Sequence, residues 1–329
     1  MWTMGSLEKT IVLVIGMPRS GTTWLGKILD CSPQSLYLHE PDSATLSPRL
    51  PIFIEGTAGR EYEEVTRAFF RSLPERAPIR AYTRRPLYEK SYHTKATWMF
   101  LNGIALAEKF FTPLSRKILP KRFGLSPGVP IVVKSVESFG RIPLFFLCID
   151  NVKMIYIVRH PCAVRYSLIR GERMGKFKDN TPVSESKPRL KQLLALNAAR
   201  TRGLSLESLF RKDPSERFAY WWTIANEKAV TECRRVACAK IIVYEKLCHE
   251  PLKVAADVYD FLGWEFSQEV KHRLESMIGR DDHRYYSVFK DPRKTVDAWR
   301  HGLSFEESSR IQDVLSSSFL ESFWNSSST

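Results

Sequence analysis

The chain has 329 residues, of which 43% are hydrophobic, 12% aromatic and 26% charged. This composition is enough to build a packed core, so it excludes a globally disordered chain. The formal net charge of +14 predicts an anionic partner, such as a nucleotide phosphate, an acidic lipid, an anionic polymer or a nucleic acid. The sequence has neither zinc-finger spacings nor a ladder of aromatic and basic residues, so we expect no nucleic-acid partner.

Segments that could direct the chain to a membrane or an export pathway are short. Residues 1–9 lack the long apolar core of a signal peptide. Apolar runs such as 144–149 are too short to span a bilayer. The six cysteines are scattered without a CxxC pair, which favours reduced thiols over a disulfide framework. We therefore expect a cytoplasmic protein without a transmembrane segment.

Strands and helices alternate along the chain. Residues 10–15 (TIVLVI) form a continuous β-branched run, which is typical of a strand buried on both faces of a parallel sheet. This run ends in a Gly/Pro/Ser turn, and a helix with an apolar face begins at Thr22. Three further strands are predicted at 130–133, 153–158 and 240–243, and helices at about 61–73, 97–112, 189–209, 216–236 and 252–262.

This alternation predicts an α/β fold, a three-layer sandwich with a central parallel sheet, formed as a single domain over residues 1–329. In such sheets ligands bind at the carboxyl ends of the strands, so we expect the polar residues that follow the four strands to converge. Residues 171–188 are rich in Lys, Ser and Pro and are expected to form a mobile loop. Residues 318–329 are expected to form a flexible tail.

The turn after the first strand has the form of a phosphate-binding loop. Gly16 and Gly21 let the backbone wrap an anion, the first N–H groups of the next helix point at it, and Thr22 and Thr23 add hydroxyl donors. A Walker A loop has Lys where this chain has Thr22, and no later strand ends in the aspartate that would hold Mg²⁺. The loop therefore suits an anion neutralised by Arg19 and backbone N–H groups better than a magnesium-bound triphosphate, and we expect no metal.

Three motifs in order make the chain resemble the sulfotransferases that use 3′-phosphoadenosine-5′-phosphosulfate (PAPS). Residues 19–23 (RSGTT) match the loop for the 5′-phosphosulfate. The strand ending at 158 is followed by Arg-His-Pro at 159–161, with Ser167 eight residues after the arginine. Residues 243–247 (VYEKL) precede Phe-Leu-Gly at 261–263. The resemblance implies the P-loop-like sulfotransferase fold and a PAPS site formed by Arg19, Ser20, Gly21, Thr22, Thr23, Trp24, Arg159, Ser167, Tyr244, Arg293 and Lys294.

The resemblance also implies which part of the co-substrate each of these residues binds. Arg159 and Ser167 hold the 3′-phosphate, which the planar fork of an arginine side chain suits. Trp24 stacks on the adenine or, alternatively, packs in the core. Arg293 and Lys294 begin a basic segment similar to the one that closes over the 3′-phosphate, although the glycines usual in that segment are missing.

A carboxylate is the expected general base. The histidine that cytosolic small-molecule sulfotransferases carry two residues after a strand-end lysine is absent, because Val136 follows Lys134 at that spacing. Residues 37–41 (YLHEP) instead resemble the Tyr-Leu-x-Glu-Pro of the carbohydrate sulfotransferases, which implies that Glu40 is the base. Arg19 and Lys134 are expected to stabilise charge at the sulfuryl group, or Lys134 is a solvated lysine. His39 is the rival base, and its side chain should diverge from that of Glu40 if the segment is extended.

These matches imply an enzyme that transfers the sulfuryl group of PAPS to a hydroxyl of a glycan or a small-molecule alcohol and releases PAP. A phenol or a peptide tyrosine is the alternative acceptor. The basic and aromatic residues 80–92 (RAYTRRPLYEKSY) form either an acceptor-binding lip or a solvated loop. Outside this class, a P-loop kinase or NTPase predicts binding of ATP with Mg²⁺, and a non-catalytic nucleotide-binding module predicts PAP binding without turnover.

Overall fold

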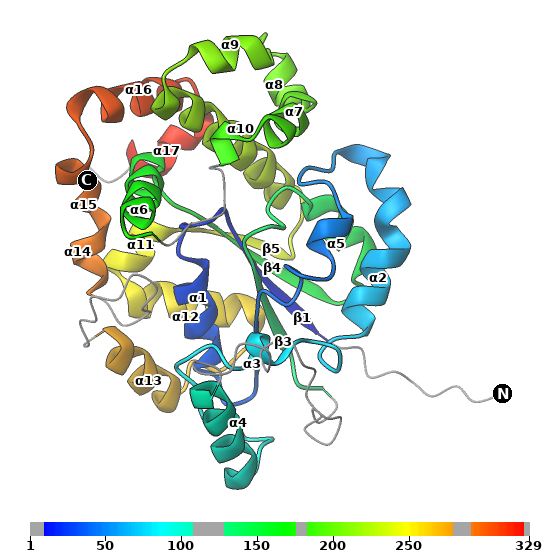
Figure 1. Ribbon diagram of the computed structural model, residues 1–329. Coiled ribbons are helices and arrows are strands. Elements are labelled where there is room, and N and C mark those ends of the chain that lie inside the picture. Colours follow the sequence, from blue (N-terminus) through cyan, green and yellow to red (C-terminus); the bar gives the residue numbers. More distant parts are fainter. Residues whose placement is uncertain (1–9, 108–127, 176–182, 279–290, 326–329) are drawn as a thin grey trace.

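A five-stranded parallel sheet with the order β2-β3-β1-β4-β5 forms the centre of the molecule (Figure 1). The computed structural model describes residues 10–107, 128–175, 183–278 and 291–325. The strands are β1 (Ile11–Ile15), β2 (Leu36–His39), β3 (Ile131–Ser135), β4 (Val152–Val158) and β5 (Ala239–Val243). β2 was not predicted from the sequence, because four residues that end in a histidine give too short an apolar pattern.

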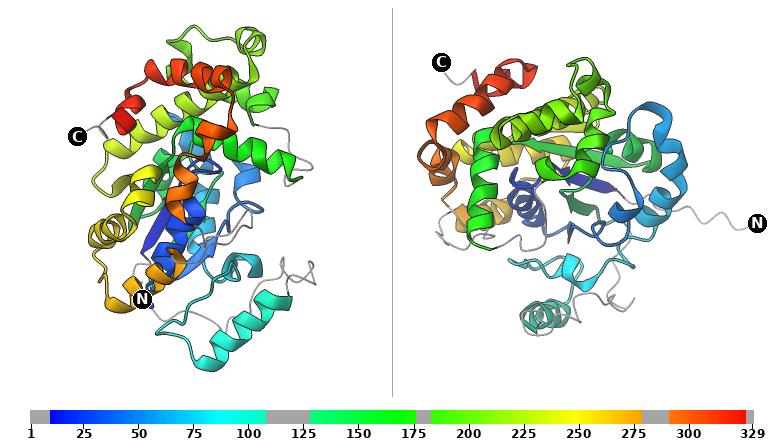
Figure 2. Two further views of the ribbon diagram at one scale, coloured as in Figure 1. Left: turned by 90° about the vertical axis from the view of Figure 1, so that its left-hand side faces the viewer. Right: turned by 45° about the horizontal axis from the view of Figure 1, so that its top comes forward.

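Helices cover both faces of this sheet, which confirms the predicted three-layer arrangement (Figure 2). One face packs on α1 (Thr22–Asp30), α11 (Tyr244–His249), α12 (Pro251–Leu262) and α13 (Gln268–Ile278). The other packs on α2 (Glu63–Arg71), α5 (Ile142–Cys148), α6 (Pro161–Arg173), α10 (Pro214–Arg234) and α16 (Phe305–Ser316).

Side chains of β1 point alternately to the two faces of the sheet, and so to the two layers of helices. Val12 and Val14 pack on the α1 side, whereas Leu13 and Ile15 pack on the α10 side. All four are essentially inaccessible to solvent. Each such side chain contributes about 1.5–3 kcal/mol when fully buried, so this strand anchors the two layers and the loop that follows it.

Shorter helices complete the described chain. They are α3 (Ile79–Tyr82), α4 (Lys95–Ala107), α7 (Lys187–Leu194), α8 (Asn197–Arg200), α9 (Leu206–Arg211), α14 (Pro292–Val296), α15 (Ala298–Gly302) and α17 (Ser322–Asn325), with 3₁₀ turns at Ser47–Arg49, Gly56–Tyr62, Val183–Glu185 and Phe319–Glu321. The single helix predicted at 189–209 is wrong: it is divided into three because Leu196 is extended and Gly203 has a φ of +62°. The last residues of the helix predicted at 97–112 lie outside the described residues.

Two predictions of mobile segments need correction. In the range 171–188, α6 continues through Arg173 and α7 begins at Lys187, so both ends are helical, and residues 176–182 lie outside the described residues. The prediction of a flexible tail is wrong for residues 318–325. There Leu320 is fully buried and Trp324 Nε1 donates a hydrogen bond to Glu245 Oε2 at 2.9 Å. Residues 326–329 lie outside the described residues.

The carboxyl ends of the strands meet at one edge of the sheet. β1 lies between β3 and β4, and the helices that follow β1 and β4 cover opposite faces. Ligands of open parallel sheets bind where the chain reverses in this way. The loops that follow β1, β2 and β4 therefore border the same place.

Candidate active site

The loop after β1 is held in an unusual backbone conformation. Arg19 has a φ of +74° and Gly21 a φ of +97°, both in the left-handed region. A Cβ on Gly21 would lie 2.3 Å from Cδ2 of Tyr244, so only glycine fits there. This close approach brings the loop against α11. The first N–H groups of α1 lie at the end of the loop, where a helix N-terminus can bind an anion. Thr22, Thr23 and Trp24 begin that helix.

Arg159 and Ser167 lie against this loop. Arg159 Nη1 donates to the carbonyl oxygen of Arg19 at 3.0 Å, and Arg19 Nε donates to Ser167 Oγ at 3.0 Å. The Arg159 guanidinium also lies 4.5 Å from the centre of the Tyr244 ring. The structure thus brings Arg19, Arg159, Ser167 and Tyr244 together, although they come from three loops far apart in the sequence.

Two buried polar atoms in this region have no hydrogen-bond partner among the described residues. They are Ser20 Oγ and Arg159 Nε. A buried donor without a partner costs about 1–3 kcal/mol, so natural proteins keep few of them. Their position between the loop and α6 fits an anion that supplies the missing acceptors, and the residues present therefore fit the phosphates of PAPS.

α14 lies against Tyr244 and Arg159. Tyr244 Oη lies 3.2 Å from Thr295 Oγ1, and Arg159 Nη2 donates to the Thr295 carbonyl oxygen at 3.3 Å. Arg293 and Lys294 are exposed on the same short helix. Trp24 is largely buried and meets the Tyr244 ring edge-on, with the ring centres 6.2 Å apart, so it packs in the core beside Tyr244.

Glu40 and Lys134 form an ion pair at the ends of β2 and β3. Lys134 Nζ donates to Glu40 Oε1, and the backbone N–H of Glu40 donates to the Lys134 carbonyl oxygen at 2.8 Å. Lys134 is buried, so the alternative of a solvated lysine is wrong. Burial lowers the pKa of Lys134, and the carboxylate of Glu40 opposes that shift. Glu40 remains 31% exposed, so its carboxylate is accessible from solvent.

His39 does not diverge from Glu40 as the sequence predicted. β2 ends at His39, and Glu40 has a φ of +49°, so the chain turns there instead of continuing extended. His39 Nε2 consequently lies 3.9 Å from Glu40 Oε1, and Nδ1 lies 2.8 Å from Tyr37 Oη. Burial, with the nearby charge of Lys134, holds the pKa of His39 well below its usual range. The imidazole is therefore neutral and already bound to Tyr37.

Two family models match this chain. The model described as "Sulfotransferase family" matches residues 12–194, and the model described as "Sulfotransferase domain" matches residues 144–322. Each match covers more than half of the 329 residues. The chain belongs to the sulfotransferase family. This result confirms the resemblance read from the motifs.

The known relatives include proteins named carbohydrate sulfotransferases. Mouse carbohydrate sulfotransferase 5 is 23% identical over 334 residues, which cover 93% of this chain and 78% of the relative. Carbohydrate sulfotransferase 2 of mouse and of human is 26% identical over 198 residues, which cover 56% of this chain and 37% of those proteins. The chain therefore spans little more than a third of the length of the carbohydrate sulfotransferase 2 proteins.

Solved sulfotransferase structures are also similar to this chain, with lower sequence identity than the relatives above. The sulfotransferase domain from the curacin biosynthetic pathway is 17% identical, with a TM-score of 0.48, and the match covers 94% of this chain and 97% of that domain. A mouse sulfotransferase complexed with PAP is 14% identical, with a TM-score of 0.40, and the match covers 97% of this chain and 85% of that one.

A group of residues around Asp42 was missed by the sequence reasoning. Asp42 Oδ2 accepts hydrogen bonds from Ser135 Oγ at 2.6 Å and Ser138 Oγ at 2.8 Å. Ser135 directly follows Lys134, and Asp42 comes two residues after Glu40, so these bonds fix both strand ends relative to one another. The short Pro-Asp-Ser sequence after Glu40 is a turn signal that could have indicated this role.

Two further findings on the described residues concern membrane-spanning helices and groups of metal-ligating side chains. No helix of the described ranges has both the length and the apolar character needed to cross a membrane. Within the same residues, His, Cys, Asp and Glu side chains form no group of three or more that could hold a metal ion.

Proposed function

We propose that this sulfotransferase moves the sulfuryl group of PAPS to a hydroxyl of a glycan or a small-molecule alcohol, with Glu40 as the general base. The observation that carries the proposal is the Glu40–Lys134 ion pair at the strand ends. β3, which carries Lys134, lies directly beside β1 and its loop. The base and the phosphosulfate loop would therefore face the same reacting group.

PAPS binding is supported by the loop and by Arg159. Arg19 and Ser167 are hydrogen bonded, so the loop proposed to bind the phosphosulfate and a residue proposed to bind the 3′-phosphate are neighbours. Arg159 would bind the 3′-phosphate through Nε, the nitrogen without a partner in the described chain. Arg293 and Lys294 would close the nucleotide side from α14. PAPS supplies the sulfuryl group, and PAP is the leaving group.

Transfer needs three groups of this chain. Glu40 removes the proton of the acceptor hydroxyl while its oxygen forms a bond to sulfur. The bond from sulfur to the phosphate oxygen of PAP breaks at the same time, and the electron pair goes to that oxygen. Lys134 and Arg19 stabilise the negative charge that develops there. The neutral His39 lies beside Glu40 without competing for the proton.

A carbohydrate acceptor is supported by the names of the mouse and human relatives. A phenol or a peptide tyrosine is the alternative acceptor.

The six cysteines are all free, which favours a reducing compartment and supports the predicted cytoplasmic location.

An acceptor screen tests the proposal. The enzyme is incubated with PAPS and, separately, chitotriose, chondroitin, 4-nitrophenol and a tyrosine-containing peptide, and sulfated products are detected by mass spectrometry. We expect sulfation of a carbohydrate. The substitution Glu40→Gln should lower kcat by about 100-fold or more, because general-base catalysis contributes on that order, with PAP affinity within about two-fold of wild type.

Glu207→Gln is the matched control, because Glu207 is also an ion-paired carboxylate but lies exposed on α9. It should retain the wild-type rate. A wild-type rate in Glu40→Gln would show that Glu40 is not the base. PAP binding without sulfation of any acceptor would instead favour a non-catalytic module.

A further inference from the structure

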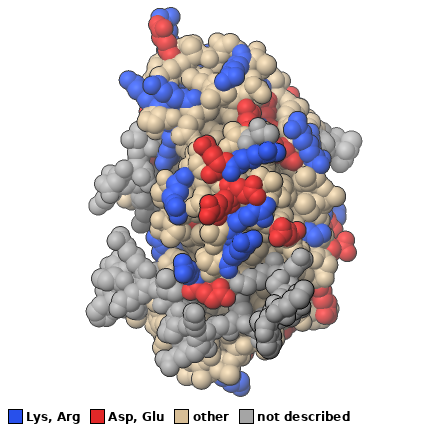
Figure 3. All heavy atoms as spheres, turned by 90° about the vertical axis from the view of Figure 1, so that its right-hand side faces the viewer, with Lys and Arg blue, Asp and Glu red and all other residues tan. Residues whose placement is uncertain are grey.

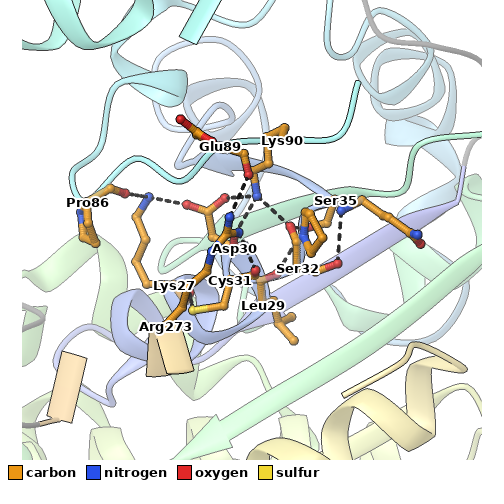
Figure 4. Close-up of polar contacts among 12 residues, drawn as sticks. Lys27, Leu29, Asp30, Cys31, Ser32, Ser35, Pro86, Glu89, Lys90 and Arg273 are labelled. Atoms are coloured by element: carbon orange, nitrogen blue, oxygen red, sulfur yellow. Dashed lines mark hydrogen bonds and ion pairs between the residues drawn. The ribbon is translucent and has the colours of Figure 1, made fainter. Parts of the chain in front are cut away.

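A buried cluster of charges joins α1 to the basic and aromatic segment that precedes α4 (Figure 4). Asp30, at the end of α1, accepts from two lysines: Lys27 Nζ at 2.7 Å from Oδ2 and Lys90 Nζ at 2.8 Å from Oδ1. The side chains of Lys27, Asp30 and Lys90 are 0%, 5% and 7% exposed. Two lysines thus share one carboxylate inside the protein.

The same cations also bind backbone carbonyl groups across the junction. Lys90 Nζ donates to the carbonyl oxygen of Asp30, the last residue of α1, at 2.6 Å and to that of Ser32, just beyond the helix, at 2.9 Å. In the opposite direction, Lys27 Nζ donates to the Pro86 carbonyl oxygen at 2.9 Å. Each lysine therefore holds the backbone of the other segment.

Arg273 of α13 binds both segments at once. Its Nη1 donates to the Cys31 carbonyl oxygen at 2.9 Å, and its Nη2 donates to the Glu89 carbonyl oxygen at 3.2 Å. Figure 4 shows this guanidinium reaching the same junction as the lysines. Residues 86–90 are consequently fixed to the end of α1 from two sides.

Such a cluster is a costly way to pack two segments. Removing an ion from water costs several kcal/mol, and well-packed apolar residues often stabilise a fold as well or better. Burial alone would raise the pKa of Asp30, but the charges of Lys27 and Lys90 hold it below its usual value. What the charges add is a fixed geometry, because each must keep its partners at hydrogen-bond distance.

The segment that is fixed in this way lies along β2, the strand that precedes Glu40. α3 packs on β2, and Tyr92 Oη donates to the Ser35 carbonyl oxygen at 3.1 Å, just before β2 begins. Lys27 Nζ also lies 4.4 Å from the centre of the Tyr37 ring, and Tyr37 Oη contacts His39. Burial is the main cause that lowers the pKa of His39 and of Lys134, and the charge of Arg84 adds to it, so Arg84 lies near both. Residues 84–92 thus run along β2, with Arg84 towards the Glu40 end and Tyr92 at the opposite end.

We propose that Asp30, Lys27 and Lys90 form a buried latch that holds residues 84–92 as one wall of the acceptor site, and that Lys90 is a positioning residue for the acceptor. This inference rests on the proposed function. PAPS contacts the first turn of α1 and its loop, whereas Lys90 acts at the last turn. Loss of Lys90 should therefore change acceptor binding and leave nucleotide binding unchanged.

The test compares three variants. Lys90→Met keeps Asp30 paired with Lys27, so it leaves no unpaired buried charge and should fold. Lys90→Arg retains a cation with several donors and should restore part of the function. Lys212→Met is the control, because it removes a lysine from an ion pair with Glu216 on the surface of α10.

Hydrogen exchange, calorimetry with PAP, and steady-state kinetics with chitotriose and chondroitin are the three measurements. For Lys90→Met we expect about ten-fold faster amide exchange in residues 86–92, about ten-fold higher KM for the sulfated carbohydrate, a smaller change in kcat, and a PAP Kd within about two-fold of wild type. Lys90→Arg should lie between this variant and wild type, and Lys212→Met should match wild type.

Two results would overturn the latch. One is unchanged exchange in residues 86–92, which needs no acceptor and is independent of the proposed function. The other is an unchanged KM with only a lower melting temperature, which would make the cluster purely structural. If no carbohydrate is sulfated, the proposed acceptor fails, while the exchange of residues 86–92 still decides whether the latch exists.

Discussion

At the scale of single residues, the ion pair between Glu40 and Lys134 is the contact that supports the proposed carboxylate base. The sequence placed Lys134 at the end of a strand, but it predicted no strand before Glu40 and could not show that the two residues touch, because they are 94 positions apart. The contact follows from the register of β2 on β3, in which His39 is opposite Lys134. A strand of four residues sets that register, and its pattern is too short to recognise.

Gly21 provides the sharpest test of the phosphosulfate loop. Gly21→Ala places a Cβ against the Tyr244 ring and a side chain at a φ of +97°, so it should distort the loop and weaken PAP binding by about ten-fold or more. Isothermal titration calorimetry with PAP measures the change. Gly203→Ala is the control, since Gly203 also has a positive φ but a Cβ added there would meet no atom within 4 Å.

Similar losses of affinity in both glycine variants would show that the effect is a general loss of stability, because Gly203 lies in the connection between α8 and α9. An unchanged PAP Kd in Gly21→Ala would contradict the assignment of this loop to the nucleotide.

At the scale of elements, the loop after β4 is clamped by the C-terminal helices. The His160 ring stacks on Trp299 of α15 with the ring centres 5.0 Å apart, and Trp324 of α17 meets it edge-on at 5.1 Å. The backbone N–H of His160 donates to Glu245 Oε1 at 3.0 Å. Because His160 follows Arg159, these contacts hold the arginine that is proposed to bind the 3′-phosphate.

Acid should weaken this clamp. Burial lowers the pKa of His160 to about 4, from 6.5 for an ordinary histidine. The unfolded chain therefore takes up a proton as the pH falls below 6.5, whereas the folded chain does not until about pH 4. Stability present above pH 6.5 is lost across this window, by up to roughly 3 kcal/mol for this residue alone.

The measurement is the free energy of unfolding of wild type and His160→Gln between pH 7.5 and pH 4, at each of several pH values. Burial raises the pKa of Glu245, which acts in the opposite direction, but that contribution is common to both proteins. The difference between them should shrink as the pH falls. A difference that stays constant would show that His160 does not titrate as described.

The sequence predicted the elements that have a strong pattern, and it failed where tertiary contacts decide. β1, β3, β4 and β5 were all predicted, because each contains a run of β-branched or other apolar residues. The tail was not, because Leu320 and Trp324 stand among serines that resemble a flexible segment. The contacts of Trp324 with Glu245 and with His160 show that this tail is folded onto α11 and the loop after β4.

At the scale of the whole molecule, the net charge of +14 does not by itself locate an anion-binding site. On the face turned to the viewer in Figure 3, basic and acidic side chains are interspersed. The cations that matter for the proposed function instead come from loops at the carboxyl edge of the sheet, with Arg19, Lys134 and Arg159 at the strand ends. Total charge therefore indicated an anionic partner but did not indicate its place.

The most direct test is calorimetry of PAP and, separately, ATP with Mg²⁺, on wild type and Arg159→Met. We predict that wild type binds PAP, that Arg159→Met binds it at least about ten-fold more weakly because a charged hydrogen-bonding fork is lost, and that ATP with Mg²⁺ gives no saturable heat. Binding of ATP with Mg²⁺ and none of PAP would contradict the assignment of this site to PAPS.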